Sequence, residues 1–305
     1  MSTSASSDSL GQEIPVNVED CFTAVRALET GVKELKGQKK NPVKAQFAII
    51  GGVAVAALTR PYANKYPTTV INFPNVIKRQ TKINLELQIQ DKNTLAGLWT
   101  ALNGLGYLPH GVDDPISAPG GNFMTSAEGN KYLLDREYDA TGHKRSRKLA
   151  QVPFDISELD KSRLLDYMDK GQVFSSASIV DLAVDGYPTK LPTFRPHVVL
   201  LLKIEGASQR EQTTQKDFVD IGLLVALAAD LSISHTSFNN FRSRDAWRQR
   251  IVPAARRWAD KSNKKAETVV NWLADKGDIS KDPVTKQAAT KLWEAYFATL
   301  LKFIV

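Results

Sequence analysis

The stretch FAIIGGVAVAAL, residues 47–58, decides the fold because it joins an apolar run to a glycine pair and then to small apolar residues. The run ending at Ile50 predicts a buried strand, the glycines predict a tight turn, and Val53 to Leu58 predict a helix. Such a unit leaves backbone N–H groups and the positive helix end beside an open space, which suits a phosphate. The alternative is a turn whose glycines serve packing alone.

Elements of both kinds flank this stretch. Residues 83–90 alternate strictly between apolar and polar and predict a strand, whereas the residues from 208 onward have a wholly helical pattern. Further strands are expected at 68–73 and within 122–138, 148–156, 179–184 and 198–204. The expected helices cover 16–37, 93–105, 209–231, 237–259, 264–276 and 283–305.

This order of elements predicts an α/β (α+β) fold in which a mixed-sheet domain precedes an all-α domain. We expect a flexible Ser-rich tail over residues 1–15, the mixed-sheet domain over 16–206 and the helical C-terminal domain over 207–305. The two domains are of ordinary size.

The composition excludes several classes of protein. In the 305 residues, 42% are apolar and 24% are charged, which is typical of a globular chain and excludes collagen, coiled coils and disordered proteins. Cys21 is the single cysteine, so an intrachain disulfide and a cysteine-based zinc site are excluded. The start lacks a leader pattern and the apolar runs are too short to span a bilayer, so we expect an intracellular protein, cytoplasmic or nuclear, without membrane contact.

The positive charge is concentrated in one segment. Between residues 241 and 265, six Arg and three Lys face two Asp, so this segment carries the whole net charge of +7. Cations mixed with tryptophans predict a nucleic-acid partner through 241–265. In the alternative, the arginines are merely solvated, while the aromatic and apolar residues at helical spacing belong to the core, namely Phe241, Trp247, Ile251, Ala254 and Trp258.

A second basic cluster lies before a short apolar stretch that contains an acid. It consists of His143, Lys144, Arg145, Arg147 and Lys148. Because it precedes Asp155 closely in sequence, we expect it to line the same cleft as that acid.

Five stretches resemble, in this order, the nucleotidyltransferase-fold superfamily, specifically the branch that includes AbiEii-type toxins. They are FAIIGGVAVAAL, KRQTKINLEL, VPFDI, VVLLLKIEGASQR and QKDFVDIGLLVAL, and the resemblance covers residues 20–230. The last two stretches match most closely. They read as a strand ending in a lysine, a linker with an arginine and a K-D-x-x-D helix start, with Lys203, Arg210, Lys216, Asp217 and Asp220 at the matching positions.

The resemblance implies a nucleotide site with Mg²⁺ and a nucleoside triphosphate as cofactors. Gly51 and Gly52 would hold the phosphates. Arg79 and Thr81, which match the strand that carries the first metal ligands in the family, would contact the nucleotide. Lys203 and Lys216 would neutralise phosphate charge. Asp217 and Asp220 would orient the lysines or the acceptor, and Arg210 would contact the nucleotide. In the alternative, the charges of the K-D-x-x-D group cap a helix and form surface pairs.

The sequence departs from the family pattern at the metal-binding acids. Where the family has D-x-D, this chain has Ile83 and Leu85, and Asn84 and Glu86 follow one residue late. Asp155 matches the third acid. We therefore expect Glu86 and Asp155 to hold the metal and Asn84 to contact the nucleotide, since hard Mg²⁺ prefers carboxylate oxygen. Asp91, at the end of the strand, is an alternative metal ligand. In another interpretation, Asn84 and Glu86 simply belong to a solvated face of the strand.

Three functions remain open at this point. The first is an Mg²⁺-dependent enzyme that transfers a nucleoside monophosphate from a triphosphate to a nucleic-acid or protein acceptor. The second is a catalytically degenerate relative that binds a nucleotide, a nucleic acid or a protein. The third is a helical scaffold with a vestigial cleft. A Rossmann dehydrogenase is disfavoured because GGVAVA lacks the third glycine.

Overall fold

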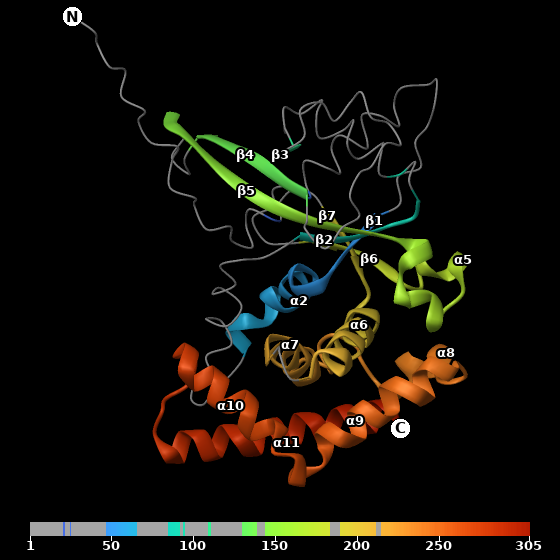
Figure 1. Ribbon diagram of the computed structural model, residues 1–305, viewed down its shortest axis with the longest axis vertical. Helices are drawn as coiled ribbons and strands as arrows, with labels where there is room; N and C mark the ends of the chain where they lie inside the picture. The colour runs from blue at the N-terminus through green and yellow to red at the C-terminus, as the bar shows by residue number, and fades with distance from the viewer. Residues whose placement is uncertain are drawn as a thin grey trace, which may run out of the picture.

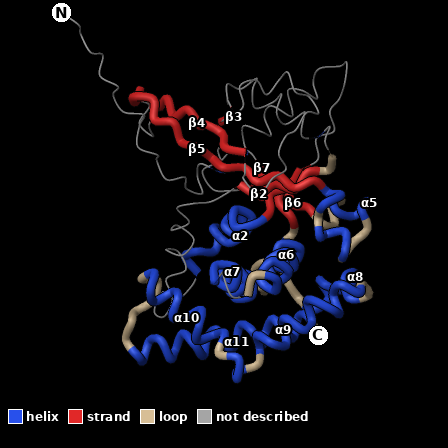
Figure 2. The backbone as a smooth tube through the Cα atoms, viewed as in Figure 1, coloured by secondary structure: helices blue, strands red, loops and turns tan. Residues whose placement is uncertain are grey.

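A mixed sheet forms one layer of the molecule, and the described helices lie on one side of it (Figures 1 and 2). The computed structural model describes residues 21, 25, 47–65, 85–91, 94, 109–110, 130–138, 144–183, 190–211 and 215–305. The expected α/β (α+β) fold, with a mixed sheet followed by helices, is confirmed.

The sheet has seven strands in the order β3-β4-β5-β2-β1-β7-β6. Two neighbouring pairs are parallel, β1 with β7 and β2 with β5, and the other pairs are antiparallel. The strands are β1 (Phe47–Ile50), β2 (Leu85–Ile89), β3 (Pro109–His110), β4 (Asn130–Tyr138), β5 (Lys144–Glu158), β6 (Ile179–Ala183) and β7 (Lys190–Phe194).

The glycine turn joins β1 to α2 (Gly51–Thr59), as the sequence predicts. Gly51 has a φ of 68°, in the left-handed region that favours glycine, so this residue makes the sharp turn from strand to helix. From Gly52 to Thr59 every residue of α2 is buried, because the helix is apolar on all sides and lies between the sheet and the next helical layer. The 3₁₀ helix η1 (Arg60–Lys65) follows.

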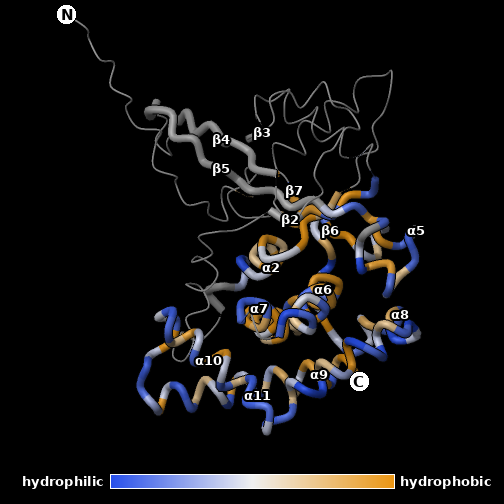
Figure 3. The backbone as a smooth tube through the Cα atoms, in the orientation of Figure 1, coloured by the Kyte–Doolittle hydropathy of each residue, from blue (hydrophilic) through white to orange (hydrophobic). Residues whose placement is uncertain are grey.

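The remaining helices form two layers below α2. The inner layer is α6 (Pro196–Gln209) with α7 (Gln215–Ala226), which contact each other and α2. The outer helices are α8 (Asn239–Arg242), α9 (Val252–Ala259), α10 (Lys265–Lys276) and α11 (Pro283–Ile304). Figure 3 shows apolar stretches in α6 and α7 beside polar ones, and the outer helices alternate between apolar and polar residues.

Short helical segments connect these elements. They are α5 (Lys170–Val173), the 3₁₀ helices η2 (Leu159–Lys161), η3 (Arg163–Asp166), η4 (His235–Phe238) and η6 (Lys261–Asn263), and the π-helix η5 (Trp247–Ile251). Among the helices that the structure describes, none has the length and hydropathy needed to cross a membrane.

The expected strand at 198–204 is wrong, because these residues belong to α6. Val198 to Leu201 are buried in succession, and a short apolar run of this kind fits a buried strand or a buried helix equally well. Pro196 in the first turn favours the helix. The partner of β6 is β7 instead. The expected domain boundary at residue 206 therefore falls inside α6, and the continuous helical part begins at Pro196.

The other expected elements differ mainly in their bounds. The helix expected over 209–231 is divided between the end of α6 and α7, and the one expected over 237–259 is divided into α8, η5 and α9. α10 and α11 lie where the sequence predicts them. Cys21 is helical, as expected, and is buried, while the strand expected at 68–73 lies outside the described residues.

The aromatic residues of the basic segment belong to the core. Phe241, Trp247 and Trp258 are buried, together with Ile251 and Ala254, so the core interpretation of these residues is confirmed. The Trp258 ring packs edge-on against Phe218 of α7, which fixes α9 against the inner layer.

Candidate functional site

Three neighbouring strands bring the glycine turn and the two expected metal ligands together. Ile50 of β1 pairs with Glu86 of β2, and Glu86 pairs in turn with Asp155 of β5. Gly51 follows Ile50 directly, so the turn starts beside these two register positions. Residues paired in register are neighbours across the strands, with Cα atoms about 5 Å apart. The backbone thus places Glu86 beside the N-terminus of α2, and Asp155 one strand further away.

The N-terminus of α2 has no side-chain cap. Ile50 occupies the N-cap position, and its side chain makes no capping hydrogen bond. The first turn of α2 contains no acidic residue. The first N–H groups of a helix have no partner within the helix, and they carry its partial positive charge. The start of α2 is therefore suited to an anion.

Strand β2 is buried on both faces at its carboxyl end. Leu87 and Ile89 are buried, as the alternation predicts, but Gln88 between them is only 1% exposed. The Gln88 side chain donates a hydrogen bond of 2.7 Å to the carbonyl oxygen of Ser157 on β5. The polar face of this strand is thus covered at Gln88 and not solvated there.

The remaining residues expected on or near this strand divide into two groups. Arg79, Thr81 and Asn84 lie outside the described residues. The Asp91 carboxylate accepts hydrogen bonds from the backbone N–H and the hydroxyl of Thr94, at 2.8 and 3.0 Å. Asp91 thus has local partners within the chain.

The lysine and the two aspartates of the closing motif form one buried cluster. The Nζ of Lys203 on α6 lies 3.2 Å from Asp217 Oδ1 and 2.7 Å from Asp220 Oδ2 on α7. Lys203, Asp217 and Asp220 are 8%, 5% and 1% exposed. Arg210, whose side chain is more exposed, binds the other oxygen of Asp217 at 2.9 Å. The structure therefore brings together four of the expected site residues.

The cluster neutralises its own charge. Two cations, the buried Lys203 and the more exposed Arg210, face two carboxylates, so the charges of the cluster balance. Burial raises the pKa of Asp220, and the neighbouring Lys203 and Lys216 partly offset this rise. Asp217 and Asp220 thus hold the Lys203 ammonium in place, and a role of these residues toward a nucleotide stays a prediction.

Space for the Arg210 side chain depends on a glycine. A Cβ atom at Gly206 would lie 2.9 Å from Arg210 Nη2 and 3.9 Å from Asp217 Oδ2. Any larger residue at 206 would therefore push the guanidinium away from Asp217. Since α6 and α7 both contact α2, the cluster and the glycine turn share α2 as a common neighbour.

A further buried acid lies outside the residues that the sequence predicts for the site. Glu205 of α6 is 2% exposed and accepts hydrogen bonds from the Tyr167 hydroxyl, from Arg163 at 3.1 Å and from Gln209 at 2.6 Å. Arg250 of the π-helix η5 lies 3.4 Å from the same carboxylate. The signal was present, because Glu205 interrupts the apolar run of α6 two residues after Lys203.

The Glu205 network connects three parts of the chain. Tyr167 follows η3, Glu205 lies on α6, and Arg250 belongs to the outer helical layer. Arg250 also forms an ion pair with Asp166, and its guanidinium lies 5.5 Å from the centre of the Tyr167 ring. Burial raises the pKa of Tyr167, and the neighbouring Glu205 carboxylate adds to the rise. The tyrosine therefore stays protonated and serves as a donor.

Most arginines of the basic segment 241–265 are paired within the chain. Their partners are acids of other elements, or backbone carbonyls in the case of Arg242. The pairs are Arg242 with the Phe303 carbonyl at 2.9 Å, Arg244 with Asp169 at 2.8 Å, Arg250 with Asp166, and Arg257 with Glu211 at 2.7 Å. These contacts attach the outer helices to the rest of the molecule. Contact of this segment with nucleic acid stays a prediction.

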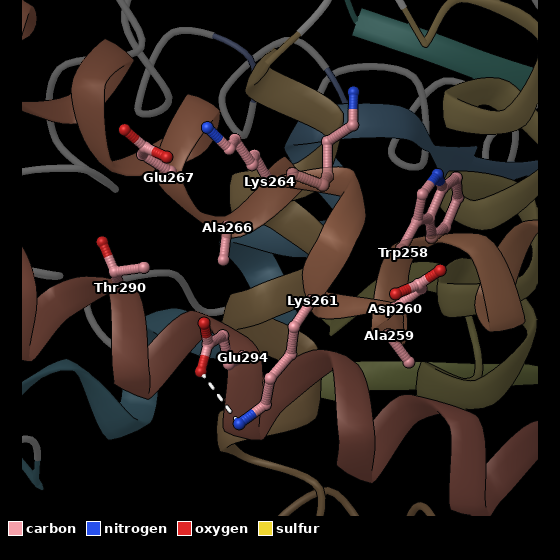
Figure 4. A pocket seen from close by; sticks show the side chains of 10 residues that line it. Trp258, Ala259, Asp260, Lys261, Lys264, Ala266, Glu267, Thr290 and Glu294 are labelled. Atoms are coloured by element: carbon pink, nitrogen blue, oxygen red, sulfur yellow. Dashed lines mark ion pairs between the residues drawn. The ribbon is translucent and has the colours of Figure 1, made fainter.

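A pocket of the described part of the chain lies away from the expected site. It lies among α9, η6, α10 and α11 and contains both signs of charge, with Lys261 and Lys264 beside Asp260, Glu267 and Glu294 (Figure 4). Lys261 and Glu294 approach to 3.4 Å within it. Among the described side chains, no group of three or more His, Cys, Asp or Glu residues could hold a metal.

No protein-family model matches the chain, and no curated protein matches it in sequence. Among solved structures, the chain is similar to an antigenic nucleotidyltransferase-like protein from Paracoccidioides brasiliensis. The identity is 14% and the TM-score is 0.38, over 88% of this chain and 92% of the other. A likeness of this size carries no weight for function, so the site must be judged on its own geometry.

Proposed function

We propose that the chain is a nucleotidyltransferase-like protein that binds a nucleoside triphosphate with Mg²⁺ beside the N-terminus of α2. One observation carries the proposal, namely the register that sets Ile50, Glu86 and Asp155 side by side on three strands. Gly51 begins the helix at this point. An uncapped helix start next to two carboxylates supports both halves of such a ligand, the phosphates and the cation.

The two acids suit magnesium in number and in chemistry. Mg²⁺ keeps several waters and is commonly bound by one or two carboxylates together with substrate phosphates. Glu86 and Asp155 supply two carboxylates, and a triphosphate would supply further oxygens. When bound, the metal neutralises charge on the phosphate oxygens. A second metal of the kind used in two-metal sites lacks its ligands at Ile83 and Leu85.

The remaining residues have roles that follow from their contacts. The N–H groups of the first turn of α2 would donate to phosphate oxygens, and the missing side chains of Gly51 and Gly52 would let the phosphate approach. Asp217 and Asp220 hold the Lys203 ammonium, and Lys216 adds positive charge near Asp220. Arg210 forms an ion pair with the Oδ2 atom of Asp217. Because the two aspartates balance Lys203 and Arg210, we infer that Lys216 supplies the surplus positive charge of this cluster for the nucleotide.

Transfer of the nucleoside monophosphate is the second candidate function. The register of Glu86 against Asp155 favours it, because two acidic residues at paired positions keep part of the metal site that the resemblance to nucleotidyltransferases implies. The acceptor would then be a nucleic acid or a protein. If the single acid pair is too little for catalysis, the chain is a binding module with the same cleft.

Calorimetric titration tests the proposal. Each common nucleoside triphosphate is titrated into the protein with and without Mg²⁺, using wild type, Glu86→Gln, Asp155→Asn and Lys203→Met. Asp181→Asn, an exposed acid of β6, is the matched control. We expect Mg²⁺-dependent binding that weakens about tenfold or more in each site variant and is unchanged in the control. Absence of binding by the folded wild type would overturn the proposal, and release of pyrophosphate would separate transfer from binding.

A further inference from the structure

The β4–β5 hairpin extends beyond the rest of the sheet (Figure 1). β3 pairs only with residues 131–132 of β4, and β2 pairs only with residues 154–158 of β5. In the part of the chain that the structure describes, residues 133–138 and 144–151 thus form a two-stranded ribbon without a third strand. We call this ribbon the arm.

The arm carries the second basic cluster away from the candidate nucleotide site. A strand advances about 3.3 Å per residue, so Lys148 lies about 23 Å and Lys144 about 36 Å from Asp155 along β5. The expectation that this cluster lines the same cleft as Asp155 is therefore wrong. The reason is that residues 144–158 form one continuous strand and do not fold back.

The charges of the arm are unbalanced. It contains five cations, Arg136, Lys144, Arg145, Arg147 and Lys148, but only two acids, Asp135 and Glu137. The strand register also sets two positive residues opposite each other, because Arg136 pairs directly with Lys148. Like charges directly opposite each other destabilise a strand pair. Such a pair is stabilised when an anion lies against both residues.

The ladder is irregular where the cations are densest. Between the pairs Arg136 with Lys148 and Tyr138 with Lys144, β4 contributes one residue and β5 contributes three. The extra residues of β5 fall in the run Arg145-Ser146-Arg147. Irregularities of this kind bend the strand, increase its twist and redirect side chains. Two arginines thus lie in the part of the arm where the ladder is interrupted.

We propose that the arm binds the phosphate backbone of a nucleic acid. A two-stranded ribbon fits the major groove of a duplex, and cations spaced along it match a row of phosphates. The rival basic segment 241–265 is less suited, because its arginines at 242, 244, 250 and 257 are already bound within the chain. The proposal does not depend on nucleotide binding at Gly51, so the two can fail separately.

Fluorescence anisotropy with a labelled duplex about two helical turns long tests the proposal. The full-length protein is titrated without nucleotide between about 50 and 200 mM salt. The arm variant is K144Q/R145Q/R147Q/K148Q. The control, R248Q/R256Q/K261Q/K264Q, removes the same charge from exposed positions of the basic segment. Circular dichroism and a melting curve establish that both variants are folded.

We expect the arm variant to bind at least about tenfold more weakly at low salt, with a salt slope lower by about 0.9 for each phosphate that the arm no longer neutralises. The control should keep most of the affinity and slope. An equal loss in both variants would overturn the proposal, because it would show that net charge alone drives binding. Binding by the arm variant with an unchanged slope would overturn it as well.

A second measurement avoids the variants. Lysine acylation of the wild-type protein, read by mass spectrometry, should show protection of Lys144 and Lys148 by the duplex and none at Lys281, a surface lysine of the linker before α11. Poly-glutamate serves as the acidic-protein probe. If it protects the same lysines and displaces the duplex at equal charge concentration, the arm is a surface for acidic proteins, and the proposal fails.

Discussion

Gly222 of α7 lies directly against the ring of Trp293 on α11. A Cβ atom at position 222 would lie 2.1 Å from two ring carbons of Trp293, far inside normal contact distance. The indole is fully buried and packs against Phe297 and Tyr296, so it has no room to move aside. The close approach of these two helices therefore requires glycine at 222.

We predict that Gly222→Ala lowers the free energy of unfolding by about 3 kcal/mol, since overpacking a rigid core costs this order of magnitude. Gly171→Ala is the matched control, because a Cβ there meets nothing within 4 Å. It should change stability by less than about 1 kcal/mol. Urea unfolding curves measure both. The double variant with Trp293→Leu should lose less stability than the sum of the two single losses, and a simple sum would contradict the explanation.

The Glu205 network should contribute strongly to stability. Glu205→Gln removes a buried charge that Arg163, Gln209 and the Tyr167 hydroxyl all contact. We predict that the free energy of unfolding falls by about 2 kcal/mol. This is less than the loss for a fully enclosed ion pair, because Arg163 is half exposed. Glu267→Gln, on the exposed side of α10, is the control. Equal effects of the two substitutions in urea unfolding would show that the network is unimportant.

The buried lysine should protect its two aspartates from repulsion. Lys203→Met leaves Asp217 and Asp220 side by side in the core, where burial already raises the pKa of Asp220. We predict that the free energy of unfolding falls by about 3 kcal/mol at neutral pH. The raised pKa means that the folded state disfavours the ionised form of Asp220. The loss of unfolding free energy should therefore become smaller as the pH falls and Asp220 takes up a proton. Unfolding curves between pH 7 and pH 4 that stay parallel to those of wild type would contradict this account.

His197 should make the protein sensitive to acid. Burial, and next the nearby Arg195, lower its pKa from 6.5 to about 4. The ring stacks on Phe241 at 5.9 Å and meets Phe238 edge-on. Because the unfolded chain binds the proton more readily, stability falls as the pH drops from about 6.5 to about 4, by at most about 3 kcal/mol. The variant His197→Gln should lack this part of the pH dependence.

The measurement compares the pH dependence of wild type with that of His197→Gln, so contributions of other groups cancel. His235→Gln is the control, since His235 is an exposed residue of η4. If His197→Gln keeps the full pH dependence of wild type, the loss of stability in acid comes from another group.

Local signals explain which parts of the fold were predictable. The strand, turn and helix at 47–58 depend on neighbouring residues, and so does the start of α11, where Asp282 caps the helix and Pro283 occupies its first turn. The apolar run of α6 fits a strand or a helix equally well, and Pro196 before it is a weak local signal for the helix. Its state is decided by burial on all sides, which a single sequence does not reveal.

The candidate site was predictable in its residue types but not in its geometry. The K-D-x-x-D spacing led to Lys203, Asp217 and Asp220, which do form one cluster. The pairing of Glu86 with Asp155 depends on strand order, and no local pattern contains that information. The pairs of Arg250 with Asp166 and of Arg244 with Asp169 join residues 84 and 75 positions apart. Sequence reasoning therefore took these arginines as solvated or available to a partner.

The helices α6 and α7 are shared by the sheet-containing half and the outer helical half of the described chain. α6 and α7 lie between α2 on one side and the outer helices on the other, so each half of the molecule uses them as its own interior. A fragment starting at residue 207 would keep α7 but lose the α2 and α6 surfaces that cover it. Neither half would then be a modular unit that gene fusion could exchange between proteins. The architecture should be inherited as a whole, with insertions confined to loops outside this helical pair.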